Sequence, residues 1–153
     1  MKLIKQSFEI IPQENTLEGL YKHIEKCGRI CYKSEDKITE DSAKPFVDRL
    51  IKSQHTSMLE HSTVYLTVPI KEALDYAVKL FNLEDDPYTK TEVSKDKVNI
   101  TTNLRVIVEN GWEELLKFIS EPTEYHYKRV TVKFVTDQGI LREFTRHKLF
   151  CVA

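Results

Sequence analysis

Helix-like and strand-like patterns follow each other irregularly along this chain, and that order constrains the fold more than any other feature. The clearest strand pattern is 63–68, where Val64, Leu66 and Val68 alternate with Thr63, Tyr65 and Thr67. Segments with apolar residues every three or four positions lie on both sides of it. No regular β-α-β rhythm develops, and no Gly-x-Gly-x-x-Gly follows a strand. We therefore expect an α+β fold, with a mixed or antiparallel sheet packed against several helices.

Four strands and two polar segments are expected around these helices. The polar stretch 83–97 is the best candidate for a mobile insertion, because it combines charge with few apolar residues. A second polar loop covers 33–42, and the junction 54–62 joins a helix to a strand. The expected strands are 2–12, 63–68, 99–108 and 129–135.

Five segments are expected to be helical. Asn15 caps the first, Glu18 completes a capping box, and the apolar stripe continues to Cys31. Asp137 caps the last. The other apolar faces are Phe46, Val47, Leu50 and Ile51 in 43–53; Leu74, Ala77, Val78 and Phe81 in a helix opened by Pro69; Trp112, Leu115, Leu116 and Ile119 before Pro122; and Ile140, Leu141 and Phe144 in the last helix.

Composition narrows the class of protein. The 153 residues fit one domain, 1–153, and the charged and aromatic content argues against disorder. A net charge of -1 disfavours a nucleic-acid or membrane-surface binder. Three Cys and no secretory leader disfavour a disulfide framework, so a cytoplasmic location is expected. No apolar run approaches the roughly 20 residues that a membrane-spanning helix needs.

The first cluster of reactive side chains is the junction 54–62. It brings His55, Ser57, Glu60 and His61 to a point where a helix gives way to a strand. Such junctions can present side chains to a polar ligand, with His55 donating or titrating and Glu60 accepting. The alternative is a loop whose hydroxyls and carboxylate cap the neighbouring backbone, which is the more common role of short polar junctions.

A second cluster concentrates positive charge near the end of the chain. Arg142 and Arg146 lie four residues apart on one helix face, and His147 and Lys148 follow. These groups form a local anion site that could take a phosphate or the anionic edge of a reduced cofactor. A solvated helix face with cations at its C-terminal end explains the same pattern about equally well.

The third cluster ends the first helix. Cys27 and Cys31 are spaced unlike a redox or zinc Cys-x-x-Cys pair, so buried small hydrophobes are the favoured interpretation. Arg29 interrupts this apolar helix end and needs a partner. No metal site is expected, because the histidines are scattered at His23, His55, His61, His126 and His147.

Three of these segments, taken in order, resemble motifs of the flavin-dependent thymidylate synthases. Residues 28–32 (Gly-Arg-Ile-Cys-Tyr) are similar to that family's Ala-Arg-x-Ser/Cys-Tyr/Phe block. Residues 55–61 resemble its His-x-Thr/Ser-x-x-Glu-His block, and 146–148 resemble the start of its signature, Arg-His-Arg, seven residues, then Ser. The Asn-Leu-Arg-Val of 103–106 and the Glu-Pro-Thr-Glu of 121–124 resemble an expanded form of the family.

The resemblance implies a specific reaction. The family methylates dUMP to dTMP with methylenetetrahydrofolate as the carbon donor, reduced FAD as the hydride source and NADPH as the reductant of the flavin. It is a homotetramer with sites between subunits. The resemblance implies that Arg146 is catalytic and stabilises charge on the flavin or the pyrimidine. It also implies that FAD is bound by Cys31, His55, Ser57, Glu60, Arg146, His147 and Lys148.

Two departures from the family pattern modify this expectation. Lys148 replaces the second Arg of the signature, so a planar two-pronged donor becomes a point charge. Five residues follow Lys148, so the signature Ser would fall three residues beyond Ala153. We therefore expect a C-terminally truncated portion that is inactive alone, with an exposed apolar patch at 149–152. The alternative is a non-catalytic remnant that oligomerises or binds a nucleotide or anion through Arg142, Arg146 and Lys148.

Overall fold

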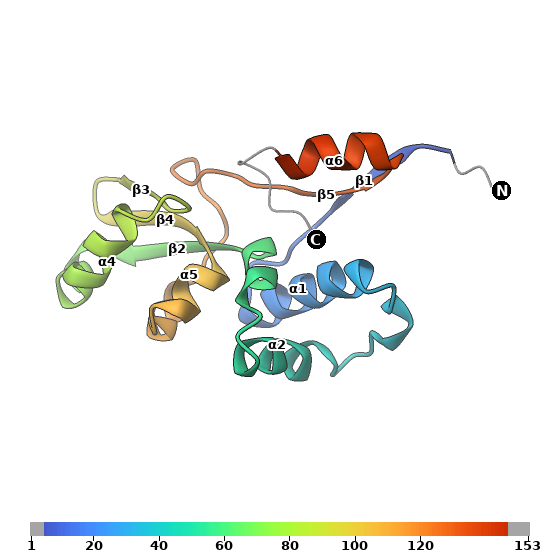
Figure 1. The fold of residues 1–153 in the computed structure, drawn as a ribbon. Helices are drawn as coiled ribbons and strands as arrows, with labels where there is room; N and C mark the ends of the chain where they lie inside the picture. Colours follow the sequence, from blue (N-terminus) through green and yellow to red (C-terminus); the bar gives the residue numbers. More distant parts are fainter. Residues whose placement is uncertain (1–4, 147–153) are drawn as a thin grey trace.

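The structure is a computed structural model that describes residues 5–146, including the side chains of residues 5–144. Its strands pair antiparallel in two separate sheets, and helices pack around them (Figure 1), so the expected α+β class is confirmed. Figure 1 shows a three-stranded sheet at one end, two packed helices at the other, and a two-stranded ribbon under the last helix. None of the helices in the described part of the chain is long and apolar enough to cross a membrane.

The three-stranded sheet forms one end of the molecule (Figure 1). Its strands are β2 (Thr63–Pro69), β4 (Lys97–Asn103) and β3 (Lys90–Val93), in the order β2-β4-β3. Leu66 pairs with Ile100, and both side chains are fully buried, as the alternating pattern of 63–68 predicts. The polar segment 83–97, expected as an insertion, contains β3, so part of it is an edge strand of this sheet.

The expected strand 99–108 is wrong in its second half. β4 ends at Asn103, whose side-chain oxygen accepts a hydrogen bond from the Val106 backbone N–H at 3.0 Å and caps α5 (Leu104–Glu109). The apolar residues Leu104 and Ile107 then point into the core at helical spacing. Asparagine is a strong helix-capping residue, and here its capping outweighs the β-propensity of the Val-Ile-Val run.

The two packed helices are α1 (Leu17–Cys31) and α2 (Ala43–Lys52), joined through the short 3₁₀ turn η1 (Glu35–Lys37). Thr16 caps α1, because its hydroxyl accepts from the Gly19 backbone N–H at 3.0 Å. The expected cap, Asn15, instead donates to Glu121 at 2.6 Å and ties the helix start to the chain after η4 (Glu113–Phe118). The predicted helix around Trp112 is this 3₁₀ segment.

The expected helix after Pro69 forms in three pieces. These are α3 (Ile70–Ala73), the 3₁₀ turn η3 (Leu74–Tyr76) and α4 (Ala77–Glu84). The apolar face predicted to point inward is wrong, because Leu74, Val78 and Phe81 are exposed and Leu83 is fully buried instead. An amphipathic pattern shows that a helix has two different faces, but it does not show which face meets the core.

The ribbon joins the beginning of the chain to its later part. β1 (Ser7–Ile11) pairs with β5 (Thr131–Val135). Asp137 caps α6 (Gln138–Arg146) as predicted, because its carboxylate accepts from the Gly139 and Ile140 backbone N–H groups at 2.8 and 3.0 Å. α6 folds back over the ribbon, where Phe144 stacks on Phe134 with ring centroids 5.0 Å apart.

The main core lies between α1, α2, β2, β4 and α5. Close packing of this kind makes helix and strand positions interdependent, because a shifted element would open a void. The largest fully buried aliphatic side chains are Leu20, Ile24, Val47, Leu59, Val64, Leu66, Leu83, Ile100, Leu104, Ile107 and Leu115.

His23 connects α1 to the ribbon from inside the protein. Its imidazole is buried, and Nε2 lies 2.8 Å from the Thr131 hydroxyl of β5. Burial lowers the pKa of His23, and the Pro12 backbone carbonyl acts in the opposite direction more weakly. The folded state therefore favours the neutral ring.

The lowered pKa predicts a loss of stability in acid. The unfolded chain takes up the proton first, so the contribution of neutral His23 is complete well above pH 6.5 and decreases as the pH falls through that value toward the lower pKa of the folded state. The free energy of unfolding, measured by urea denaturation, should fall between about pH 7.5 and about pH 5. His23→Gln should reduce this decrease, whereas His55→Gln, at an exposed histidine, should leave it unchanged. Equal pH dependence in wild type and His23→Gln would contradict the prediction.

Candidate functional site

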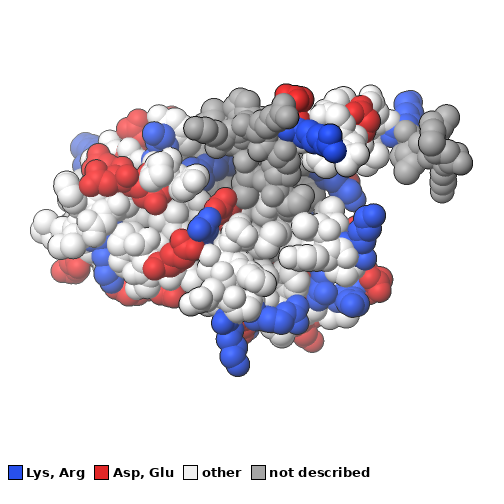
Figure 2. Space-filling model, viewed as in Figure 1, with Lys and Arg blue, Asp and Glu red and all other residues white. Residues whose placement is uncertain are grey.

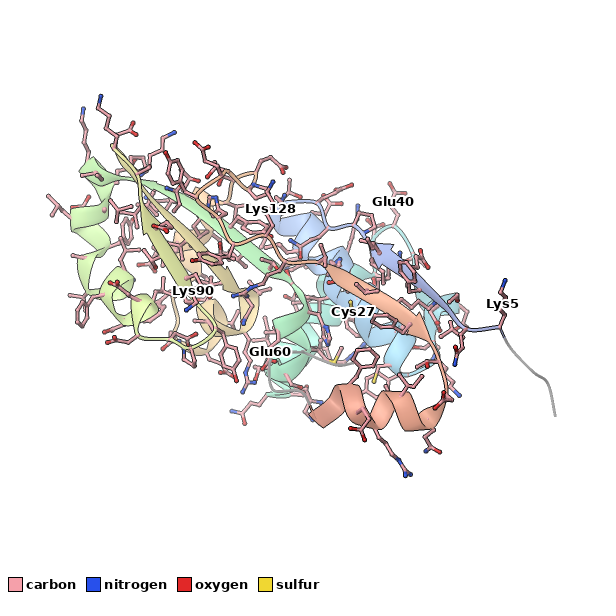
Figure 3. All side chains as sticks on the ribbon, turned by 90° about the horizontal axis from the view of Figure 1, so that it is seen from above. Lys5, Cys27, Glu40, Glu60, Lys90 and Lys128 are labelled. Atoms are coloured by element: carbon pink, nitrogen blue, oxygen red, sulfur yellow. The ribbon has the colours of Figure 1, made fainter. Side chains whose placement is uncertain are left out.

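The junction before β2 forms the 3₁₀ segment η2 (Thr56–His61), which contacts α1, α2 and α5. Its inward side chains are Met58 and Leu59, which are buried and anchor the segment to the core. His55 and Ser57 are exposed, so both can reach a ligand. Figure 3 shows Glu60 on this segment, between the three-stranded sheet and α1.

Glu60 is held by a network that joins η2 to α5. The Glu60 carboxylate forms an ion pair with the Arg105 guanidinium. Arg105 Nε also donates to Glu109 Oε1 at 2.8 Å, and the Thr56 hydroxyl donates to the same oxygen at 2.5 Å. The Arg105 guanidinium thus lies between the carboxylates of Glu60 and Glu109 and ties η2 to α5.

The pKa values of this network reflect these contacts. The Thr56 hydroxyl, followed by Arg105, lowers the pKa of Glu109, because both hydrogen bonds favour its charged form. Glu109 and Glu60 raise the pKa of Arg105. Burial lowers the pKa of His61 at the end of η2, and the nearby Glu60 charge partly opposes this effect. These shifts keep both Glu109 and Arg105 ionised at neutral pH, so the ion pairs persist there.

The end of α1 places its two cysteines in different environments. Cys27 is buried as expected, and burial raises the pKa of its thiol to about 11, so it is not a thiolate at neutral pH. Cys31 is exposed, and the prediction that it is a buried small hydrophobe is wrong. Exposure leaves Cys31 able to contact a ligand, which is the role that the family resemblance implies for it.

Gly28 brings the end of α1 against η2 and α2. A Cβ atom at this position would lie 2.7 Å from Cζ and 3.0 Å from Cε1 of the Phe46 ring, and 3.6 Å from the methyl of Met58. The Phe46 ring is itself buried and cannot move away freely. The elements that carry the motif blocks 28–32 and 55–61, α1 and η2, are neighbours in the fold, with the Met58 methyl beside the Gly28 position.

Gly28→Ala should destabilise the protein by about 1–2 kcal/mol. Overpacking costs about 1–3 kcal/mol, and the better helix propensity of Ala returns up to about 1 kcal/mol. The free energy of unfolding from urea denaturation measures the effect. Phe46→Leu should cost less in the Gly28→Ala background than in wild type, because it makes room for the new methyl group. Additive effects of the two substitutions would contradict a steric origin.

The buried partner of Arg29 is Glu25, one turn earlier in α1. Glu25 is 1% exposed, and its Oε1 accepts from Arg29 Nε and Nη2 at 3.2 and 3.0 Å. Its Oε2 accepts from the Ser42 hydroxyl at 2.8 Å, just before α2. The expectation that Arg29 requires a partner is confirmed. These contacts are structural, since they satisfy a carboxylate that burial would otherwise destabilise.

The cationic cluster near the end of the chain is described only in part. Arg142 and Glu143 are exposed on α6 and make electrostatic or other contacts. Arg146 is the last residue of α6, and its side chain lies outside the described residues, as do His147, Lys148 and the expected apolar patch at 149–152. In Figures 1 and 3 α6 runs back so that its C-terminal end lies on the same side of the molecule as η2.

Two open cavities lie away from η2. A cavity of about 450 Å³ beside α1 is lined by Lys22, Glu25, Lys26, Ile30, Glu35, Ile38, Thr39 and Lys133. Another of about 230 Å³ lies next to the ribbon and includes Gln13, Tyr65 and Arg129. His55, Ser57 and Glu60 line neither of these two cavities. Among the described residues, His, Cys, Asp and Glu form no group of three that could hold a metal ion.

The sequence patterns find part of this arrangement. They single out 28–32 and 55–61, whose elements are in contact, but they miss Glu25 and Glu109 and the ion-pair and hydrogen-bond roles of Arg105 and Thr56. Both missed pairs, Glu25 with Arg29 and Arg105 with Glu109, have the i, i+4 spacing of helical ion pairs. That spacing was the available signal, but it applies to 105–109 only if this stretch is helical. The positive and negative side chains are mixed over the face in Figure 2, as the balanced composition suggests.

The chain matches no protein-family model, no curated protein and no solved structure.

The Glu60–Arg105 contact should contribute measurably to stability. A double-mutant cycle with Glu60→Ala and Arg105→Ala should give a coupling free energy of about 0.5–1 kcal/mol, which decreases at high salt. Lys44 and Asp48 provide the control pair, because both are more exposed and lie on one helix. Their coupling should be about 0.5 kcal/mol or less. A coupling for Glu60 and Arg105 below that of the control would show that the network is not structural.

Proposed function

We propose that this chain carries part of a flavin-dependent thymidylate synthase, whose complete protein methylates dUMP to dTMP. Methylenetetrahydrofolate donates the carbon, and NADPH reduces the flavin. The observation that carries the proposal is the order of three motif blocks, at 28–32, 55–61 and 146–148. The contact between α1 and η2 supports it, because these elements bring two blocks that are remote in sequence close together.

The exposed residues of the junction suit an FAD site. Cys31, His55 and Ser57 are accessible and offer a thiol, an imidazole and a hydroxyl to the isoalloxazine or its ribityl-phosphate arm. Glu60 is already paired with Arg105, so it contributes by fixing η2 against α5 as well as by accepting from the cofactor. Arg146, His147 and Lys148 supply the positive charge that an anionic cofactor and nucleotide need.

The chemistry assigns separate tasks to these residues. Reduced FAD, when bound, supplies the hydride of the reaction. Arg146 acts as the catalytic cation that stabilises negative charge developing on the pyrimidine. Cys27 needs no role as a nucleophile, which agrees with its raised pKa. The proposal also includes a homotetramer, a cytoplasmic location and no binding to nucleic acid.

Complementation tests the activity. The complete reading frame that contains this chain should let a bacterium without thymidylate synthase grow without thymidine. Arg146→Ala should abolish growth, and Lys90→Ala, at an exposed lysine on β3, should not. Normal growth with Arg146→Ala, or no growth with a stably expressed wild-type protein, would overturn the proposal.

Measurements on the isolated 153-residue chain distinguish two hypotheses, a portion of the enzyme and a non-catalytic remnant that binds a nucleotide or anion. We expect it to make no dTMP and to bind FAD weakly or not at all in titration calorimetry. Tight binding of dUMP that is lost in Arg146→Ala would support the remnant instead, with the anion held at the end of α6. Robust folate-dependent dTMP formation by this chain would refute the view that it is an incomplete portion.

A further inference from the structure

The helical segment from α3 to α4 carries an apolar stripe that the described part of the molecule leaves uncovered. Leu74, Val78 and Phe81 are 79%, 75% and 66% exposed. Three large apolar side chains in one row are unusual on a surface, whereas single exposed hydrophobic residues are common. In Figure 1 α4 lies at the end of the molecule furthest from the N-terminus, and in Figure 2 the tip of that end is white, with red and blue groups around it.

A charged residue of opposite sign lies at each end of this stripe. Lys71, Leu74, Val78, Phe81 and Asp85 follow one another at spacings of three, four, three and four residues. This is the spacing of the contact positions in two heptads of a coiled coil. The backbone stays close to helical from Ile70 to Asp85, with one irregular residue at Tyr76, where φ is -113° and ψ is 11°.

The terminal charges of the stripe are available to a partner. Lys71 and Asp85 are both exposed. Neither forms an ion pair with another of the described residues, although seven such pairs occur elsewhere. The nearby Glu72 and Lys79 are already engaged with Lys117 and Glu114. The stripe therefore combines an uncovered apolar centre with one unused cation and one unused anion.

We propose that this stripe, defined by residues 71, 74, 78, 81 and 85, binds the same stripe of a second copy of the chain in antiparallel orientation. The sequence is self-complementary about Val78. Antiparallel pairing sets Val78 against its own counterpart, Leu74 against Phe81, and Lys71 against Asp85 at both ends. Parallel pairing would set Lys71 against Lys71 and Asp85 against Asp85, which is unfavourable.

The contact area limits the strength of this association. About four helical turns from each copy form a small interface, so we expect a reversible dimer with a Kd of roughly 10–1000 μM. The position of α4 at one end lets two copies meet without displacing the core. The inference rests on the exposed stripe and not on the proposed flavin chemistry, so it is tested without FAD or nucleotide.

Sedimentation equilibrium of the 153-residue chain tests the apolar part. Wild type should show a concentration-dependent dimer. Val78→Asp and Phe81→Asp should each raise the dimer Kd by roughly 100-fold, because each places an unpaired charge in the apolar centre. Val130→Asp is the matched control, since Val130 is 72% exposed but lies outside the stripe, and it should leave Kd unchanged. A monomer at about 1 mM, or a dimer unaffected by Val78→Asp, would overturn the proposal.

Charge reversal tests the antiparallel orientation. Lys71→Glu and Asp85→Lys should each weaken the dimer by roughly tenfold, because each creates two like-charge contacts. The double variant should recover the wild-type Kd, since it restores both opposite-charge contacts in reverse. All these residues are exposed, so circular dichroism should show folded protein throughout. Failure of the double variant to recover, with the fold intact, would exclude antiparallel self-association.

Discussion

The buried Glu25 carboxylate is the constraint on which the helical half of the structure depends. A carboxylate with 1% exposure needs charge and hydrogen bonds around it, and here Arg29 and Ser42 supply them from two directions. Ser42 directly precedes α2, so satisfying Glu25 fixes where α2 begins relative to α1. The Arg29 guanidinium then lies over the Phe46 ring, 4.8 Å from its centroid, and the same ring packs on Gly28. The buried Glu25 carboxylate thus helps to fix the spacing of α1 and α2, and η2 packs against both helices.

The candidate site at η2 rests on the fixed arrangement of α1 and α2, but Glu25 and Arg29 are not among its residues. η2 is anchored below by Met58 and Leu59 and at its side by the Glu60–Arg105–Glu109 network. His55 and Ser57 remain exposed on a segment that is otherwise held on several sides. A short 3₁₀ segment held in this way can present polar groups in a fixed geometry, which is what ligand binding requires of a loop.

The parts of the fold that could be predicted from the sequence are those where a local pattern is compatible with only one kind of secondary structure. β2 is one example, since an apolar pattern with a period of two residues fits only a strand. The cap of α6 is another, because Asp137 lies at the predicted position and accepts from the Ile140 backbone N–H. The failures come from patterns with two meanings. The run after Asn103 suits a strand or a helix, and only the cap decides. The stripe at Leu74, Val78 and Phe81 is amphipathic, but tertiary packing buries Leu83 instead. The Glu60–Arg105 contact joins residues 45 positions apart, which no local pattern reveals.

The pairing of β1 with β5 has a consequence for how the chain is made. Ser7 and Val135 are opposite one another, so β1 is synthesised well before its partner strand, with all the elements from α1 to η4 between them. During that interval the core formed by α1, α2, β2 and β4 can assemble, because its contacts are closer in sequence. Phe8 and Ile10 meanwhile have no strand beside them. Of the two sheets in the described part of the chain, the ribbon is therefore the one that synthesis completes last, and β1 stays open to wrong pairing until β5 has been made.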